Sequence, residues 1–115
     1  MSSITIAKAS PRLENGKIIW YEGDTFAIKL NIDLTSTEDG NSINLTTGDE
    51  IIVSFYRTDI CVHKFVFNTF VDNTIILDFD ENVTKKFNKG NYTYIITYKN
   101  INRTTIVANS DVEVE

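Results

Sequence analysis

The sequence has very few of the residues on which compact metal sites, disulfides and tight loops depend. Its 115 residues include one cysteine, one histidine, one proline and five glycines. One cysteine cannot form an intramolecular disulfide, and one cysteine with one histidine cannot complete a closed zinc site. The glycines stand singly, as in "EGD" and "KGN", and none forms a phosphate-binding loop. The composition therefore argues against a disulfide scaffold, a structural zinc domain and a P-loop enzyme.

Basic residues and long apolar runs are also scarce. Eleven Lys and Arg stand against sixteen Asp and Glu, which gives a net charge of −5 and a pI near 4.8. An acidic chain repels phosphate backbones and anionic lipid surfaces, so we expect neither nucleic acid nor a membrane as partner. The opening "MSSITIAKAS" lacks the basic start and apolar run of a secretory signal, so we expect assembly in the cytoplasm.

The residues suited to catalysis do not form a recognisable site. In "CVH", strand geometry places Cys61 and His63 on one face about 7 Å apart, too far for a direct hydrogen bond. We therefore expect Cys61 to be a half-buried small apolar residue rather than a nucleophile. No serine lies in a nucleophile-elbow motif. The sequence predicts a protein that is not an enzyme.

One acidic cluster, "DFDE", leaves two interpretations open. Asp78, Asp80 and Glu81 are candidate calcium ligands, although calcium takes about six to eight oxygen atoms. The interpretation we favour is a solvated strand face followed by a helix N-cap at Asp80. We accordingly predict no metal and no cofactor.

What the chain does contain is material for strands. It is rich in Ile, Thr, Asn and Tyr and poor in Ala and Leu, and its 42% hydrophobic content suffices for one core. Residues alternate between apolar and polar in "SITIAK" and in "TFAIKLNID", where Phe26, Ile28, Leu30 and Ile32 share a face. Turns are expected at Asn15–Gly16 and in the polar stretch 34–50, where Ile43 and Leu45 are candidates for a short edge piece. "EIIVSFYRTD" and "VHKFVFNTF" are expected to form a hairpin.

Two features near the C-terminal half complete the fold prediction. "ENVTKKFNKG" predicts a short helix near residues 81–87, capped by Asp80 and ended by Gly90, with Val83 and Phe87 on one face. In "NYTYIITYKN", Tyr92, Tyr94 and Ile96 are expected to point inward. Tyr92 is predicted to be a corner tyrosine whose hydroxyl bonds to the backbone.

These segments amount to seven to nine short strands with no βαβ alternation. They predict an all-β fold, an antiparallel immunoglobulin-like β-sandwich with one short helix, as a single domain over residues 1–115. A small β-barrel is the second choice.

Several apolar residues are candidates for contact with a partner. "WY" places Trp20 and Tyr21 on opposite faces, so one of them is exposed unless it closes the end of the sandwich. The strand that contains Phe65 and Phe67 has no purely polar face, which is typical of a strand covered on both faces or used as an interface. The full set of predicted partner-binding residues is Ile4, Ile6, Trp20, Phe65, Phe67 and Tyr98.

Three stretches carry a family resemblance. "WYEGDTFAIKLNI" (20–32), "LTTGDEIIVSFYRTD" (45–59) and "DENVTKKFNKGNYTYIITY" (80–98) resemble the N-terminal domain of phage upper-baseplate proteins of the BppU type. The shared features are a "GDT" turn opening an alternating strand, and a short helical turn before a "G.Y.Y" strand. The resemblance covers residues 18–115, and the members of that family continue beyond this domain into a longer assembly region.

The resemblance implies a small immunoglobulin-like accessory protein of a bacteriophage virion, without catalysis. Its expected partners are phage capsid or tail and baseplate proteins, with a homo-oligomer as a further possibility. Capsid decoration and a baseplate position both stay open. The alternative function is a carbohydrate-binding or host-surface adhesion module, for which Tyr21, Tyr56 and Tyr98 would have to form an exposed line.

Overall fold

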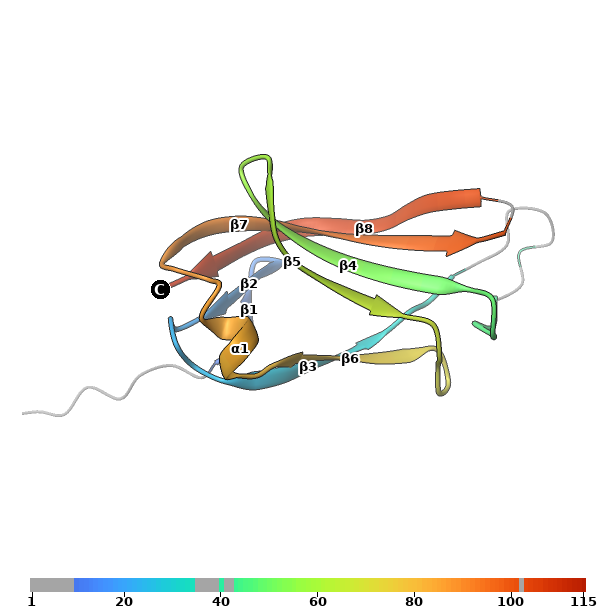
Figure 1. Ribbon diagram of the computed structural model, residues 1–115, viewed down its shortest axis with the longest axis horizontal. Helices are drawn as coiled ribbons and strands as arrows, with labels where there is room; N and C mark the ends of the chain where they lie inside the picture. The colour runs from blue at the N-terminus through green and yellow to red at the C-terminus, as the bar shows by residue number, and fades with distance from the viewer. Residues whose placement is uncertain (1–9, 35–39, 41–42, 102) are drawn as a thin grey trace, which may run out of the picture.

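The computed structural model describes residues 10–34, 40, 43–101 and 103–115, and its regular secondary structure consists almost entirely of strands (Figure 1). Within these residues there are eight strands and one short helix. They are β1 (Arg12–Glu14), β2 (Lys17–Trp20), β3 (Phe26–Asn31), β4 (Glu50–Arg57), β5 (Ile60–Phe67), β6 (Thr74–Phe79), α1 (Glu81–Thr84), β7 (Gly90–Asn100) and β8 (Arg103–Val114).

The strands form two sheets of unequal width. The larger sheet has the order β1-β2-β8-β7-β4-β5, and the smaller one contains only β3 and β6. In Figure 1 the β3–β6 pair lies below the large sheet as a second layer. This arrangement confirms the prediction of an all-β sandwich. It differs in two details, because β2 and β8 pair in parallel and because β7 and β8 are long rather than short.

Local sequence explains most of the strand ends. Asn15 and Gly16 have positive φ values of 53° and 80°, which the tight turn between β1 and β2 requires. The predicted alternation of β3 is confirmed, since its odd-numbered residues are exposed and its even-numbered ones are half-buried. The expected hairpin of β4 and β5 is also present, with Arg57 opposite Ile60.

The helix is shorter than predicted. Asp80 is its N-cap and accepts a 3.0 Å hydrogen bond from the backbone N–H of Val83, as expected. The helix ends at Thr84 with Lys85 as its C-cap, so Gly90 does not terminate it. Gly90 instead begins β7 at a φ of 147°, where a Cβ atom would lie 2.9 Å from the Arg57 guanidinium. The short helix is held by packing, because a single turn has little stability alone.

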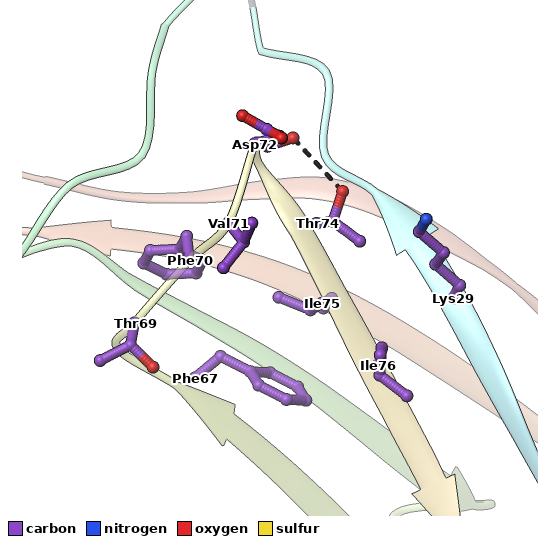
Figure 2. A pocket seen from close by; sticks show the side chains of 9 residues that line it. All are labelled: Lys29, Phe67, Thr69, Phe70, Val71, Asp72, Thr74, Ile75 and Ile76. Atoms are coloured by element: carbon purple, nitrogen blue, oxygen red, sulfur yellow. Dashed lines mark hydrogen bonds between the residues drawn. The ribbon is translucent and has the colours of Figure 1, made fainter.

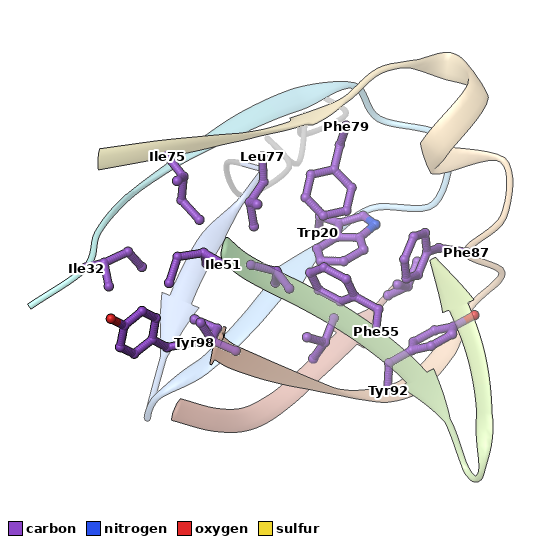
Figure 3. Close-up of a cluster of buried hydrophobic side chains, with 14 of the residues drawn as sticks. Trp20, Ile32, Ile51, Phe55, Ile75, Leu77, Phe79, Phe87, Tyr92 and Tyr98 are labelled. Carbon is purple, nitrogen blue, oxygen red and sulfur yellow. The ribbon is translucent and has the colours of Figure 1, made fainter. Parts of the chain in front are cut away.

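The core lies between the two sheets and is dominated by aromatic rings. The rings of Trp20 and Phe79 have centroids 5.1 Å apart. They pack with Phe55 and Phe87 at the centre of the cluster (Figure 3). All four side chains have 1% or less of their surface exposed. Aliphatic residues from both sheets complete the cluster, among them Ile51, Val53, Ile75, Leu77, Val112 and Val114.

A single asparagine holds the loop before β4. The side chain of Asn73 accepts a hydrogen bond from the N–H of Leu45 and donates one to the carbonyl of Ile43, both at 2.8 Å. These two bonds imitate a strand pairing, although residues 43–46 are not a strand and the predicted edge piece is absent there. Asn73 itself has a φ of 57°, a conformation that asparagine tolerates well.

Candidate protein-binding surface

The outer face of the large sheet carries a row of β-branched side chains that crosses four strands. Val66 pairs with Ile52, Ile52 with Thr97, and Thr97 with Ile106, so the four residues lie side by side on β5, β4, β7 and β8. We call this set the outer row. It stands opposite the core, because the neighbours Ile51, Val53 and Tyr98 point inward and are buried.

The outer row is accessible to a partner. Val66 is 53% exposed and Ile106 is 61% exposed, while Ile52 and Thr97 between them are half-buried. The adjacent row along the same strands contains Ile95 as its apolar member beside the polar Lys64 and Asn109. An apolar strip with polar groups beside it is typical of a surface that contacts another protein.

The structure corrects two of the predicted contact residues. Trp20 is completely buried, so its ring belongs to the core and is not available to a partner. Tyr98 is only 5% exposed, and its hydroxyl donates a 3.2 Å hydrogen bond to the Asp49 carboxylate. Both residues point inward because Trp20 pairs with Val114 and Tyr98 with Ile51, which are themselves core residues.

The remaining predicted contact residues have different positions. Phe65 and Phe67 are half-buried and face the core, where the Phe65 ring lies 5.3 Å from that of Phe79. They are thus mainly packing residues, and the exposed side of β5 is formed by Val66 instead. Ile4 and Ile6 lie outside the described residues.

The line of tyrosines required for a sugar platform does not form. Tyr56 lies on the outer face of β4, on the same face as Ile52, whereas Tyr98 is buried on the inner face. Tyr21 is half-buried after β2, with the Arg12 guanidinium 5.5 Å from its ring centre. The three rings therefore do not share one surface.

A β-bulge separates Cys61 from His63. Phe55 pairs with His63 and Tyr56 with Cys61, so Val62 is the extra residue. Cys61 is exposed rather than half-buried as predicted, and its thiol lies 3.7 Å from the carbonyl of His63. The ring Nδ1 of His63 is 3.1 Å from the Lys86 ammonium. Burial, and secondarily the Lys86 charge, lower the pKa of His63 below its usual value.

The acidic cluster takes the structural form that was favoured from the sequence. Asp80 caps α1, and Asp78 is exposed on the outer side of β6. Within the described ranges, no group of three or more metal-ligating side chains comes together. The same part of the chain contains no helix long and apolar enough to cross a membrane.

Two open grooves flank the narrow sheet. One, of about 490 Å³, lies between the end of β5 and β6, where Phe67, Phe70 and Ile75 point toward one another (Figure 2). The other, of about 320 Å³, lies on the opposite side of the narrow sheet and is lined by residues of β1, β2, β3 and β7. These grooves exist because two strands do not cover the full width of a six-stranded sheet.

The chain matches no protein-family model, and no curated protein or solved structure shows significant similarity to it. The resemblance to the upper-baseplate domain thus stays a prediction from the motifs. The outer row was missed from the sequence because strand register decides which residues become neighbours. The signal that was present is the segment around Phe65 and Phe67, which has no purely polar face and includes Val66.

Proposed function

We propose that this protein is a non-catalytic structural accessory protein of a phage particle, and that it binds a coat or tail protein through the outer row. Capsid decoration and a tail or baseplate position are both compatible with this role. The observation that carries the proposal is the apolar strip of Val66, Ile52 and Ile106 on the outer face of the large sheet. The motif resemblance to the upper-baseplate domain is the reason for proposing a coat or tail protein as the partner.

A sheet face suits this role physically. The outer row lies on four paired strands, and its four side chains are β-branched, so they have little χ1 freedom to lose when a partner covers them. Repeated copies on a particle would convert weak individual contacts into strong attachment. An accessory protein of this kind needs no enclosed site, and its binding strength comes from apolar burial.

The first experiment is mass spectrometry of purified virions of the phage that encodes the protein. We expect the protein in many copies per particle. Particles that contain none of it would overturn the proposal.

The second experiment tests the surface. We expect Ile106→Lys to remove the protein from purified particles, because it places a charge in the outer row. Ile76→Lys is the matched control, since Ile76 is 56% exposed on the opposite side of the sandwich. Equal incorporation of both folded variants would exclude the outer row as the contact.

A further inference from the structure

A further hollow lies on the outer face of the large sheet, at the end away from the outer row. It has a volume of about 350 Å³ and is lined by residues of β2, β4, β7 and β8 and of the turn that follows β4. That turn rises above β7 and β8, on the side away from the β3–β6 layer (Figure 1). Because β7 and β8 lie between β4 and β2 in the sheet, they form the floor of the hollow, with Thr58 of the turn on one side and Lys17 of β2 on the other.

Three side chains cross this floor in one row. Tyr56 of β4 pairs with Thr93 of β7, and Thr93 pairs with Asp111 of β8, so the three lie side by side on the outer face. Tyr56 is half-buried, whereas Thr93 and Asp111 are exposed. Asn91, two residues before Thr93 in β7, lies on the same face and is also exposed. A half-buried ring thus stands beside a hydroxyl, a carboxylate and an amide.

The polar groups of this hollow have no partner in the fold. Within the part of the chain that the structure describes, the side chains of Tyr56, Thr93 and Asp111 make no hydrogen bond, ion pair or ring contact. The same holds for the side chains of Lys17 and Asn91. Their donors and acceptors are therefore available to a ligand.

A saccharide matches this set of groups. A sugar ring has an apolar C–H face, which packs against an aromatic ring, and hydroxyls, which both donate and accept hydrogen bonds. Tyr56 offers the aromatic ring. The Asp111 carboxylate only accepts, the Lys17 ammonium only donates, and the Asn91 amide does both. A volume of about 350 Å³ is near the lower end for small-molecule sites, which suits one or two sugar units.

The charges around the hollow disfavour an anionic ligand. Lys17 and Asp111 carry opposite charges, and each offsets the effect of the other. A neighbouring hollow shares these two residues and adds the carboxylates of Glu14 and Glu113. The surroundings are therefore acidic, and they would repel a phosphate or carboxylate group on a ligand.

We propose that this hollow binds an uncharged saccharide, with the sugar ring on Tyr56 and sugar hydroxyls on Asp111 and Asn91. Tyr56 lies four residues along β4 from Ile52 of the outer row, a distance of about 13 Å. The inference goes beyond the proposed function and does not rest on it, because a different part of the sheet carries it.

An NMR titration of the ¹⁵N-labelled full chain tests the site. The ligands are glucose, galactose, rhamnose, N-acetylglucosamine, lactose and diacetylchitobiose. We expect at least one of them to shift the amide signals of Thr58, Thr93 and Asp111, and to leave those of Val66 and Ile106 in place. The Kd should be about 1 mM, since one ring and a few water-exposed hydrogen bonds give weak binding.

Two further ligands are matched controls. Sorbitol carries the hydroxyls of a sugar without a ring, so it has no flat apolar face for Tyr56 and should not bind. N-acetylneuraminic acid has a sugar ring and a carboxylate, and it should bind more weakly than the best uncharged sugar.

Two substitutions test the assigned roles. Tyr56→Ala should weaken binding by about tenfold, because the stacking surface is lost, whereas Tyr56→Phe keeps the ring and should weaken it much less. Asp111→Asn should also weaken binding by about tenfold, through loss of hydrogen bonds to a charged acceptor. Asp78→Asn is the matched control, since Asp78 is exposed on β6 at the opposite side of the sandwich. Circular dichroism confirms that each variant is folded.

Four outcomes would overturn the proposal. The first is the absence of shifts at Thr58, Thr93 and Asp111 with all six sugars. The second is an equal response to sorbitol, and the third is tighter binding of N-acetylneuraminic acid than of any uncharged sugar. The fourth is unchanged affinity in Asp111→Asn, a variant that also decides the matter if Tyr56→Ala does not fold.

Discussion

The hydroxyl of Tyr92 donates a 2.7 Å hydrogen bond to the backbone carbonyl of Asn88, four residues earlier. This bond confirms the expected corner tyrosine and fixes the connection between α1 and β7. The Arg57 guanidinium lies 5.4 Å from the same ring, so the corner is held from the β4 side as well.

Replacing Tyr92 with Phe should lower the free energy of unfolding by about 1 kcal/mol, the usual net contribution of one hydrogen bond. The ring would stay in the core. The bond to Asn88 would be lost, together with the long 3.4 Å hydrogen bond that the hydroxyl accepts from the Arg57 guanidinium. Urea unfolding followed by circular dichroism measures the change. Tyr94→Phe is the control, and a loss as large in that variant would contradict the special role of Tyr92.

Replacing Asp80 with Ala should destabilise the protein by about 0.5–2 kcal/mol, the range measured for helix N-caps. The cause is the loss of the hydrogen bond from the N–H of Val83. Asp78→Ala removes an equal charge two residues earlier from an exposed side of β6 and should change stability much less. Equal effects of the two substitutions in thermal unfolding would show that charge, not capping, matters here.

Stability should fall as the pH drops below about 6.5, in part because of His63. Burial and the Lys86 charge lower the pKa of His63 in the folded protein, so the unfolded chain takes up a proton first. The stabilisation from the neutral ring is therefore complete above the unfolded pKa and is lost as pH falls toward the lower folded pKa. Urea unfolding between pH 7.5 and 5 should show a shallower decline for His63→Gln.

The neighbouring Lys86 provides a separate check on this prediction. Its ammonium donates toward Nδ1 of the neutral His63 ring, and the two would repel each other once the ring is protonated. Lys86→Met should therefore raise the pKa of His63 in an NMR titration. An unchanged or lower pKa would contradict this account of the pair.

Trp20 should behave as a core residue and not as a contact residue. Trp20→Ala should cost about 3–5 kcal/mol, as large-to-small substitutions of buried aromatic side chains do. Ile106→Lys, on the outer face, should stay within about 0.5 kcal/mol of the unsubstituted protein. Because Trp20 is the single tryptophan, its fluorescence should also be shifted to the blue in the folded state. Emission typical of a solvated indole would contradict its burial.

Alternation along single strands was enough to predict the fold class, the β4–β5 hairpin and the inward direction of Tyr92. It was not enough at the end of β2, because alternation alone does not decide which of Trp20 and Tyr21 faces the core. Alternation also failed at the β5 bulge, since one extra residue at Val62 changes which side chains face outward. The outer row could not be predicted for a related reason, because Val66 and Ile106 are brought into one row only by the pairing of the two strands between them.

The parallel pairing of β2 with β8 has a consequence for how the protein folds. Ile18 faces Val112, so the sheet is joined by residues that are far apart along the chain. Pairings of this kind are slow to form, because closing a long loop costs entropy before any stabilising contact is made. During synthesis, β2 cannot take its final place until Val112 has left the ribosome. We therefore expect Trp20, the residue after Ile19 in β2, to enter the core late in folding, and its fluorescence to report a slow phase.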